Sequence, residues 1–110
     1  MKPAKMYVPQ DIPELFDFLG SMLLSAPRFL DKTGYLPFLN IDYVFQELHA
    51  GLAYNRGTLG EERYQALVRM SDQMRAYFDA DPENKTGETR KGRDIIYEME
   101  KILKEARRKS

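Results

Sequence analysis

The chain has 110 residues, with 17 lysines and arginines balanced by 17 aspartates and glutamates, one histidine, and no cysteine or tryptophan. Without cysteine it has no disulfide, no thiol nucleophile and no cysteine-ligated zinc site. Its zero net charge disfavours nucleic acid as a partner, because affinity for phosphates comes mainly from clustered, uncompensated lysine and arginine.

The first predicted helix follows an N-terminal arm, residues 1–10. Asp11 is placed to cap the first backbone amides while Glu14 reaches back, which is an aspartate version of the capping box. Apolar residues then recur at three- and four-residue steps and predict one buried face. They are Ile12, Leu15, Phe16, Leu19, Met22, Leu23 and Ala26. Phe18 and Leu24 lie off this face, so we expect a helix that is apolar on more than one side.

Residues 27–39 form the least regular segment, because Pro27, Gly34 and Pro37 interrupt any helix. Its large apolar residues are Phe29, Leu30, Tyr35, Leu36, Phe38 and Leu39. Such a loop either packs on the domain or presents a surface to a partner. Packing is the expected outcome, because contiguous exposed apolar patches are rare on monomers.

Two further helices follow. Asn40 is the predicted cap of the second helix, and Asn55 begins its stop signal. The buried face of that helix is predicted to contain Ile41, Val44, Phe45, Leu48 and Leu52. Thr58 and Glu61 predict a capping box for the third helix, which ends before Pro82. Its predicted buried face contains Tyr64, Leu67, Val68, Ser71, Met74 and Phe78.

Residues 82–92 are polar and predict an exposed loop before the fourth helix. The apolar face of that helix is predicted from Ile95, Ile96, Met99, Ile102, Leu103 and Ala106. No segment alternates as a strand. The sequence therefore predicts an all-α fold, in which residues 1–110 form a single-domain bundle of about four antiparallel helices with an irregular apolar loop between the first two.

Catalytic chemistry has little support in the sequence. His49 is the only imidazole, and it has no Glu-x-x-His or His-Glu-x-x-His pattern around it. The acids are dispersed and mostly lie off the apolar faces, so we expect neither a metal site nor a cofactor. We therefore expect a protein that is not an enzyme.

A weak anion-binding pattern lies in residues 87–94. Its two glycines have the separation found in a phosphate loop, but Arg93 and Asp94 replace the lysine and hydroxyl residue that touch phosphate and magnesium. Four cations could still attract an anion or RNA at the start of the fourth helix. These residues are Lys85, Arg90, Lys91 and Arg93. Nearby acids largely offset their charge, so a solvated loop is the favoured interpretation.

Aromatic residues are the most distinctive feature, with seven tyrosines and six phenylalanines. Tyr43 and Tyr54 are three turns apart on one side of the second helix, and Glu47 lies between them. Tyrosine is favoured at protein interfaces, and an acidic surface would suit a basic partner. We predict partner-binding residues at Tyr43, Glu47 and Tyr54, together with Tyr35 and Phe38 of the preceding loop.

These observations favour a cytoplasmic, non-enzymatic protein-binding module, such as a small inhibitor, an antitoxin or immunity-type protein, or an adaptor subunit. The partner is a protein of unknown identity, or a second copy of this chain packed against the first helix. The alternative function is binding of a small ligand in a pocket walled by Phe18, Tyr35, Phe38 and Tyr43. No membrane span is expected, because the longest early charge-free run, residues 18–27, is too short.

Overall fold

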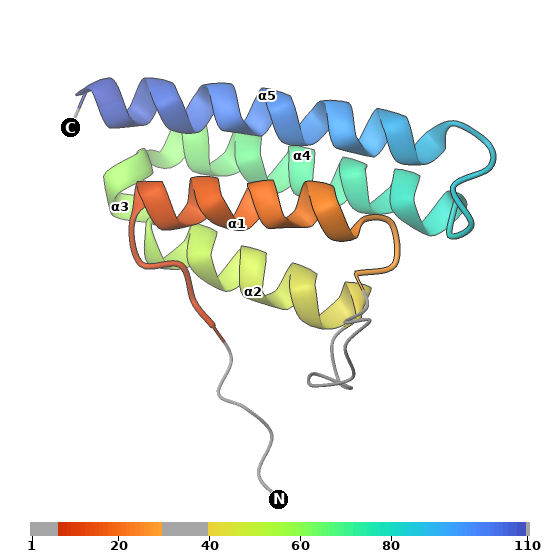
Figure 1. Ribbon diagram of the computed structural model, residues 1–110. Coiled ribbons are helices and arrows are strands. Elements are labelled where there is room, and N and C mark those ends of the chain that lie inside the picture. Colours follow the sequence, from red (N-terminus) through yellow and green to blue (C-terminus); the bar gives the residue numbers. More distant parts are fainter. Residues whose placement is uncertain (1–6, 30–39, 110) are drawn as a thin grey trace, which may run out of the picture.

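The computed structural model describes residues 7–29 and 40–109, and within these ranges it contains helices and no strand (Figure 1). The helices are α1 (Ile12–Ser25), α2 (Ile41–Tyr54), α3 (Arg56–Leu59), α4 (Glu61–Ala80) and α5 (Glu88–Lys109). The predicted all-α bundle is confirmed. The four long helices correspond to the predicted ones, and the four-residue α3 is an addition that turns the chain from α2 into α4.

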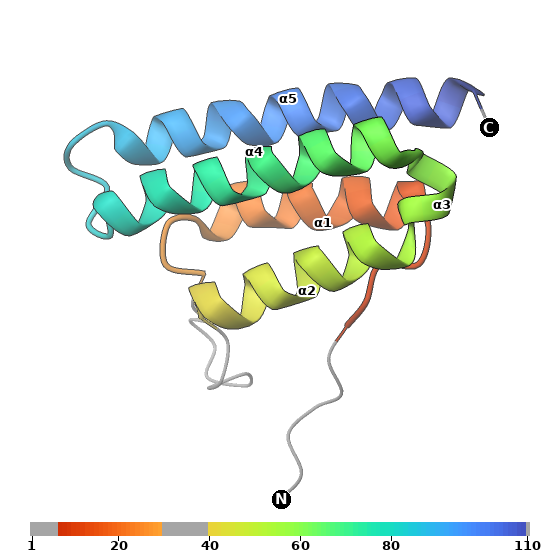
Figure 2. The same cartoon turned by 180° about the vertical axis from the view of Figure 1, so that it is seen from behind.

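The long helices run alternately up and down, so each is antiparallel to the next along the chain (Figures 1 and 2). α4 and α5 form the most extensive pair, and α1 packs on α5 while α2 packs on α4. α1 and α2 contact each other less, and together they form the layer opposite α4 and α5. This arrangement closes a ring of four helices around a shared core.

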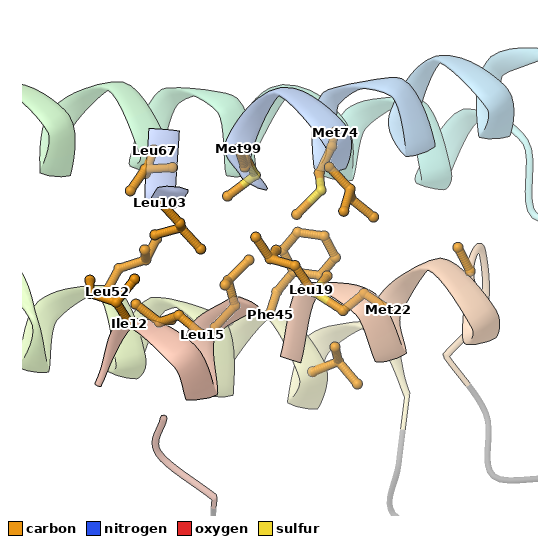
Figure 3. Close-up of a cluster of buried hydrophobic side chains, with 14 of the residues drawn as sticks. Ile12, Leu15, Leu19, Met22, Phe45, Leu52, Leu67, Met74, Met99 and Leu103 are labelled. Carbon is orange, nitrogen blue, oxygen red and sulfur yellow. The ribbon is translucent and has the colours of Figure 1, made fainter. Parts of the chain in front are cut away.

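The core is built from the predicted apolar faces, which meet between the two layers (Figure 3). Its largest fully buried side chains are Phe29, Phe78, Leu15, Leu19, Met22, Leu48, Leu52, Leu59, Leu67, Met74, Ile96 and Met99. Figure 3 shows side chains of the lower layer, such as Leu15 and Leu19, pointing toward Met99 and Leu103 of α5. Three- and four-residue spacing therefore identified the inward side of every long helix.

Two of the three helix caps predicted from the sequence are present, and the third is not. Oδ1 of Asp11 accepts from the amide of Glu14 at 2.9 Å, and the Glu14 carboxylate accepts in turn from the amide of Gln10. Asn40 caps α2 by accepting from the amide of Tyr43 at 3.0 Å.

The predicted capping box of Thr58 and Glu61 is wrong, because Thr58 lies within α3 and α4 begins after Gly60 without a side-chain cap. The Glu61 carboxylate is instead paired with Arg56 at 2.6 Å. Hydrogen bonds from Arg56 and then from Gln65 lower the pKa of Glu61 to about 2. The four-residue α3 thus inserts a turn where the sequence pattern predicted a direct helix start.

The predicted exposed loop over residues 82–92 is too long, because α5 begins at Glu88. Thr89 is fully buried, and Gly92 lies so close to Phe78 that an added Cβ would be 2.4 Å from that ring. The first turn of α5 therefore packs on the end of α4. Only residues 81–87 connect the two helices.

Phe29 shows that the start of the irregular segment packs on the domain. Its ring is buried, with its centroid 5.7 Å from that of Phe45 and 5.3 Å from that of Phe78. Its φ of +59° is in the left-handed region, which is rare for a bulky residue, and the aromatic packing stabilises this conformation. The remainder of the segment, including Tyr35 and Phe38, lies outside the described residues.

Candidate functional site

The two layers of the bundle differ in their charged residues. α1 and α2 contain four acidic residues and no lysine or arginine. The four are Glu14, Asp17, Asp42 and Glu47, and the α1 cap Asp11 adds a fifth acid. Every lysine and arginine in the five helices lies in α3, α4 or α5. The side of the bundle formed by α1 and α2 is therefore acidic, although the halves of the chain differ little in charge.

The end of the N-terminal arm lies across this acidic side. The backbone amide of Tyr7 donates to Oε2 of Glu47 at 2.9 Å, which ties the arm to α2. The ring of Tyr7 stacks on Phe18 of α1 with centroids 6.0 Å apart, and its hydroxyl donates to Glu14 at 3.2 Å. The arm thus bridges α1 and α2, which contact each other less than α1 contacts α5 or α2 contacts α4.

Pro9 also contacts α2, one turn beyond Glu47. Its carbonyl accepts from Nδ2 of the buried Asn55 at 3.0 Å, and its ring packs directly against Gly51. A Cβ at Gly51 would lie 2.8 Å from Cδ of Pro9. Gly51 is therefore a close-packing position that admits the arm.

Glu47 was predicted to lie on an open surface, but the arm covers it. It is 7% exposed, and burial raises its pKa despite the hydrogen bond from the Tyr7 amide. The helical spacing of Tyr43, Glu47 and Tyr54 does put them on one side of α2. The N-terminal arm, which is distant in the sequence, nevertheless covers Glu47. Helix periodicity does not indicate which distant segments pack on a helix.

Three other acids near the arm are the α1 cap Asp11 and Glu14 and Asp17 of α1. Burial, the hydrogen bond to Glu14 and the charges of Glu14, Asp11 and Asp17 all raise the pKa of Tyr7. Asp11 and Asp17 are exposed. The exposed acids on this side that sequence reasoning missed are therefore the α1 cap Asp11 and Asp17 of α1, and counting charges helix by helix would have revealed them.

Three tyrosines lie on this side of the molecule. Tyr7 is 46% exposed and Tyr54 is 62% exposed, and Tyr43 is partly exposed one turn before Glu47. We define the acidic aromatic face as Tyr7, Asp11, Glu14, Asp17, Phe18, Tyr43 and Tyr54. Along α2 it extends from Tyr43 to Tyr54, a distance of about 16 Å at 1.5 Å per residue.

The four predicted anion-binding cations are not gathered around an open site. Arg93 turns back to donate to the carbonyl of Ala26 at 3.4 Å. Lys91 pairs with Glu88 at 3.4 Å and lies 5.7 Å from the centroid of the Tyr77 ring. Lys85 and Arg90 are exposed. Two of the four cations are therefore engaged within the protein.

The amides that were expected to attract an anion already bind Asp81. Its buried carboxylate accepts from the amides of Lys85 at 2.6 Å, Thr86 at 3.2 Å and Thr89 at 3.1 Å. Burial alone would raise the pKa of Asp81, but these donors outweigh it and lower the pKa to about 2. An internal carboxylate therefore occupies the predicted anion position and caps α5.

His49 lies in a groove between α2 and α4. Its Nε2 is 2.9 Å from Oγ of the buried Ser71 and 3.8 Å from Oδ1 of Asp72. In a catalytic triad the acid holds the ring nitrogen opposite the serine, whereas here both groups approach the same nitrogen. Arg75 pairs with Asp42 and Asp79 at the edge of this groove. The arrangement serves to join α2 to α4, and it lacks the geometry for nucleophilic catalysis.

The predicted small-ligand pocket depended on Phe18, Tyr43, Tyr35 and Phe38. The structure places the Phe18 ring against Tyr7 of the arm. Tyr35 and Phe38 lie outside the described residues.

Metal ligation and membrane insertion are two further possibilities for residues 7–29 and 40–109. In these ranges no cluster of three or more His, Asp or Glu side chains is arranged to hold a metal ion. None of the described helices combines the length and the apolar content that crossing a bilayer requires.

The chain matches no protein-family model, no curated protein and no solved structure.

Proposed function

We propose that the protein is a non-enzymatic protein-binding module whose acidic aromatic face docks on a basic surface of another protein. The observation that carries this proposal is the coincidence, on one side of the bundle, of exposed tyrosines with acids and with helices that contain no lysine or arginine. A small inhibitor or immunity-type protein would use such a face to cover a cationic site on its target.

Each component of the face has a physical role in binding. Tyr7 and Tyr54 offer large, rigid contact area at a low cost in conformational entropy, and tyrosine is among the residues that dominate binding energy at interfaces. Asp11 and Asp17 add negative potential that attracts a basic partner and aligns it before contact. Because the Tyr7 ring is already held by Phe18 and Glu14, little ordering cost remains for that side chain when a partner binds.

A second copy of the chain is a poor occupant of this face. A two-fold dimer would place the same surface on both sides of the interface, so Asp11, Glu14 and Asp17 would oppose their own counterparts. Like charges that face each other across an interface weaken association by roughly several kcal/mol. Nucleic acid is disfavoured on this face for the same electrostatic reason.

The proposal is tested by affinity capture from a lysate of the native organism, followed by mass spectrometry and hydrogen exchange on the captured complex. We expect one stoichiometric protein with a basic surface, recovered less well as salt rises. Its binding should slow amide exchange in α1 and α2 around Tyr7 and Tyr54. A partner that protects α4 and α5 instead, or capture of nucleic acid alone, would overturn the proposal.

A further inference from the structure

A separate cleft lies at the end of the bundle where the turn after α1 meets the turn between α4 and α5 (Figures 1 and 2). Its volume is about 480 Å³, which is within the range of sites that enclose a small molecule. The apolar residues that line it are Leu24, Ala26, Pro27 and Pro82, and the charged ones are Arg28 and Glu83. None of them belongs to the acidic aromatic face.

Leu24 projects beside this cleft. Of the large apolar residues that the structure describes, it is the most exposed, at 89%. Pro27 and Pro82 also keep exposed surface, so the cleft offers apolar walls that another molecule can reach. A projecting apolar side chain next to an apolar hollow suits a self-complementary interface, because each copy must supply both parts.

The charges at the rim of the cleft are self-complementary as well. The guanidinium of Arg28 pairs with Glu83, and its Nε donates to the carbonyl of Pro82 at 3.1 Å. The Arg28 and Glu83 side chains are 51% and 57% exposed, and a pair as exposed as this contributes little to the stability of one chain. A two-fold axis can bring the Glu83 of a second copy to Arg28 and its Arg28 to Glu83, so that opposite charges meet twice.

We propose that this end of the bundle is the contact of a two-fold homodimer, in which Leu24 of each copy enters the cleft of the other. Each leucine contacts Pro27 and Pro82 of the other copy, and Arg28 and Glu83 pair across the interface. The contact is small, so we expect a weak dimer with a dissociation constant between about 10 µM and about 1 mM.

Other occupants fit this surface less well. A small molecule in the cleft would leave Leu24 exposed, whereas a second copy covers the leucine and the cleft together. The basic partner proposed for the acidic aromatic face would meet Arg28 at the rim, and like charges oppose such a contact. Asp17 of that face lies about 10 Å from Leu24 along α1, beyond the screening length of about 8 Å in physiological salt. The acids therefore oppose a dimer at Leu24 only weakly.

The first test is sedimentation equilibrium of the full chain at concentrations from about 10 µM to about 1 mM. We expect association that rises with concentration. Leu24→Asp should weaken it at least about tenfold, because a carboxylate would enter an apolar cleft. Tyr97→Asp is the matched control, since Tyr97 is an exposed apolar residue of α5 that does not line the cleft. Both side chains are exposed, so both variants should keep the melting temperature of the unaltered chain.

A charge exchange tests whether the rim pairs form between copies. Arg28→Glu and Glu83→Arg each remove the pair within one chain and put like charges at the interface, so each variant alone should associate at least about tenfold more weakly. An equal mixture of the two variants should associate at least as tightly as the unaltered chain, because opposite charges meet again only between different chains.

Three results would overturn the proposal. The first is a monomer over the whole concentration range. The second is association that Leu24→Asp leaves unchanged or that Tyr97→Asp weakens equally. The third is a mixture of the charge variants that associates no more tightly than either variant alone. None of these results bears on the protein partner, because the two surfaces share no residue.

Discussion

The backbone amide of Tyr7 donates to the carboxylate of Glu47, and this bond joins residues 40 apart in the sequence at 2.9 Å. It has two consequences for the acidic aromatic face. It buries an acid that helix spacing places on the surface, and it holds the arm so that the Tyr7 ring lies over Phe18. The arm is therefore part of the candidate site.

Glu47→Gln should stabilise the fold at neutral pH. The folded-state pKa of Glu47 is raised above 4.5, mainly by burial, so the folded chain binds a proton more readily than the unfolded chain. Its contribution to stability is full below pH 4.5 and is lost as pH rises through the folded-state pKa. Glutamine keeps an oxygen acceptor for the Tyr7 amide without carrying a charge.

Thermal unfolding from pH 4 to pH 8 checks this prediction. The melting temperature of the glutamine variant should exceed that of the unaltered chain by a few degrees at pH 7, and the gain should disappear toward pH 4. A variant that is less stable at pH 7 would show that the carboxylate is needed in its charged form.

Gly51→Ala should displace the arm while leaving the bundle folded. The new Cβ would lie 2.8 Å from Pro9 Cδ and 3.0 Å from Leu15 Cδ2, and the arm has fewer core contacts to lose than Leu15. Hydrogen exchange at the Tyr7 amide should accelerate strongly, because its bond to Glu47 opens. Slow exchange at Tyr7 in the variant would contradict this arrangement of arm and helix.

Asp81→Asn should destabilise the turn between α4 and α5 at neutral pH. The folded-state pKa of Asp81 is about 2, below its ordinary value of 3.8, so its contribution is present above pH 3.8 and is lost as pH falls toward 2. Asparagine turns one acceptor into a donor that faces the amides of Lys85 or Thr89. We expect a melting temperature several degrees lower at pH 7, and a smaller difference near pH 2. A difference that stays constant from pH 7 to pH 2 would exclude the charge as its cause.

Gly92→Ala should cost about 1–3 kcal/mol of unfolding free energy through overpacking. Its Cβ would lie 2.4 Å from Cε1 of the buried Phe78, which cannot move aside without disturbing Phe29. Gly20→Ala is the matched control, because nothing lies within 4 Å of its Cβ and alanine favours the helix by up to about 1 kcal/mol. Urea unfolding measures both variants. Equal stabilities would show that α5 does not pack on α4 at Gly92.

Much of the fold could be predicted because it depends on local patterns. The apolar spacing in each long helix reports directly which side is buried, and Asp11 and Asn40 act on amides three residues away. The start of α5 could not be predicted in this way. Residues 88–94 offer no apolar spacing and include Gly92, and the turn is capped by Asp81 from the end of the preceding helix.

The candidate site was harder to predict than the fold, because it combines segments that are far apart in the sequence. Tyr54 and Tyr43 were identified correctly as sharing one side of α2. Tyr7 and Phe18 become neighbours only when the arm folds back over the bundle. A comparison of the charges in the two halves of the chain also hides the acidity of this side. The first half includes Lys2, Lys5, Arg28 and Lys32, although α1 and α2 contain no lysine or arginine.

The most direct test of the binding proposal compares two matched double variants in capture of the protein partner. The first carries Tyr54→Ala and Asp17→Lys on the acidic aromatic face. The second carries Tyr97→Ala and Glu98→Lys on α5, where Tyr97 is 53% exposed and Glu98 pairs with Lys101 at 3.0 Å. All four side chains are exposed, so both variants should keep the melting temperature of the unaltered chain.

We predict that the first variant loses at least about tenfold in partner affinity, because it removes a tyrosine anchor and reverses a steering charge. The second should capture the partner as well as the unaltered chain does. Retention of the partner by the first variant, together with its loss from the second, would contradict the proposal and place the binding surface on α5.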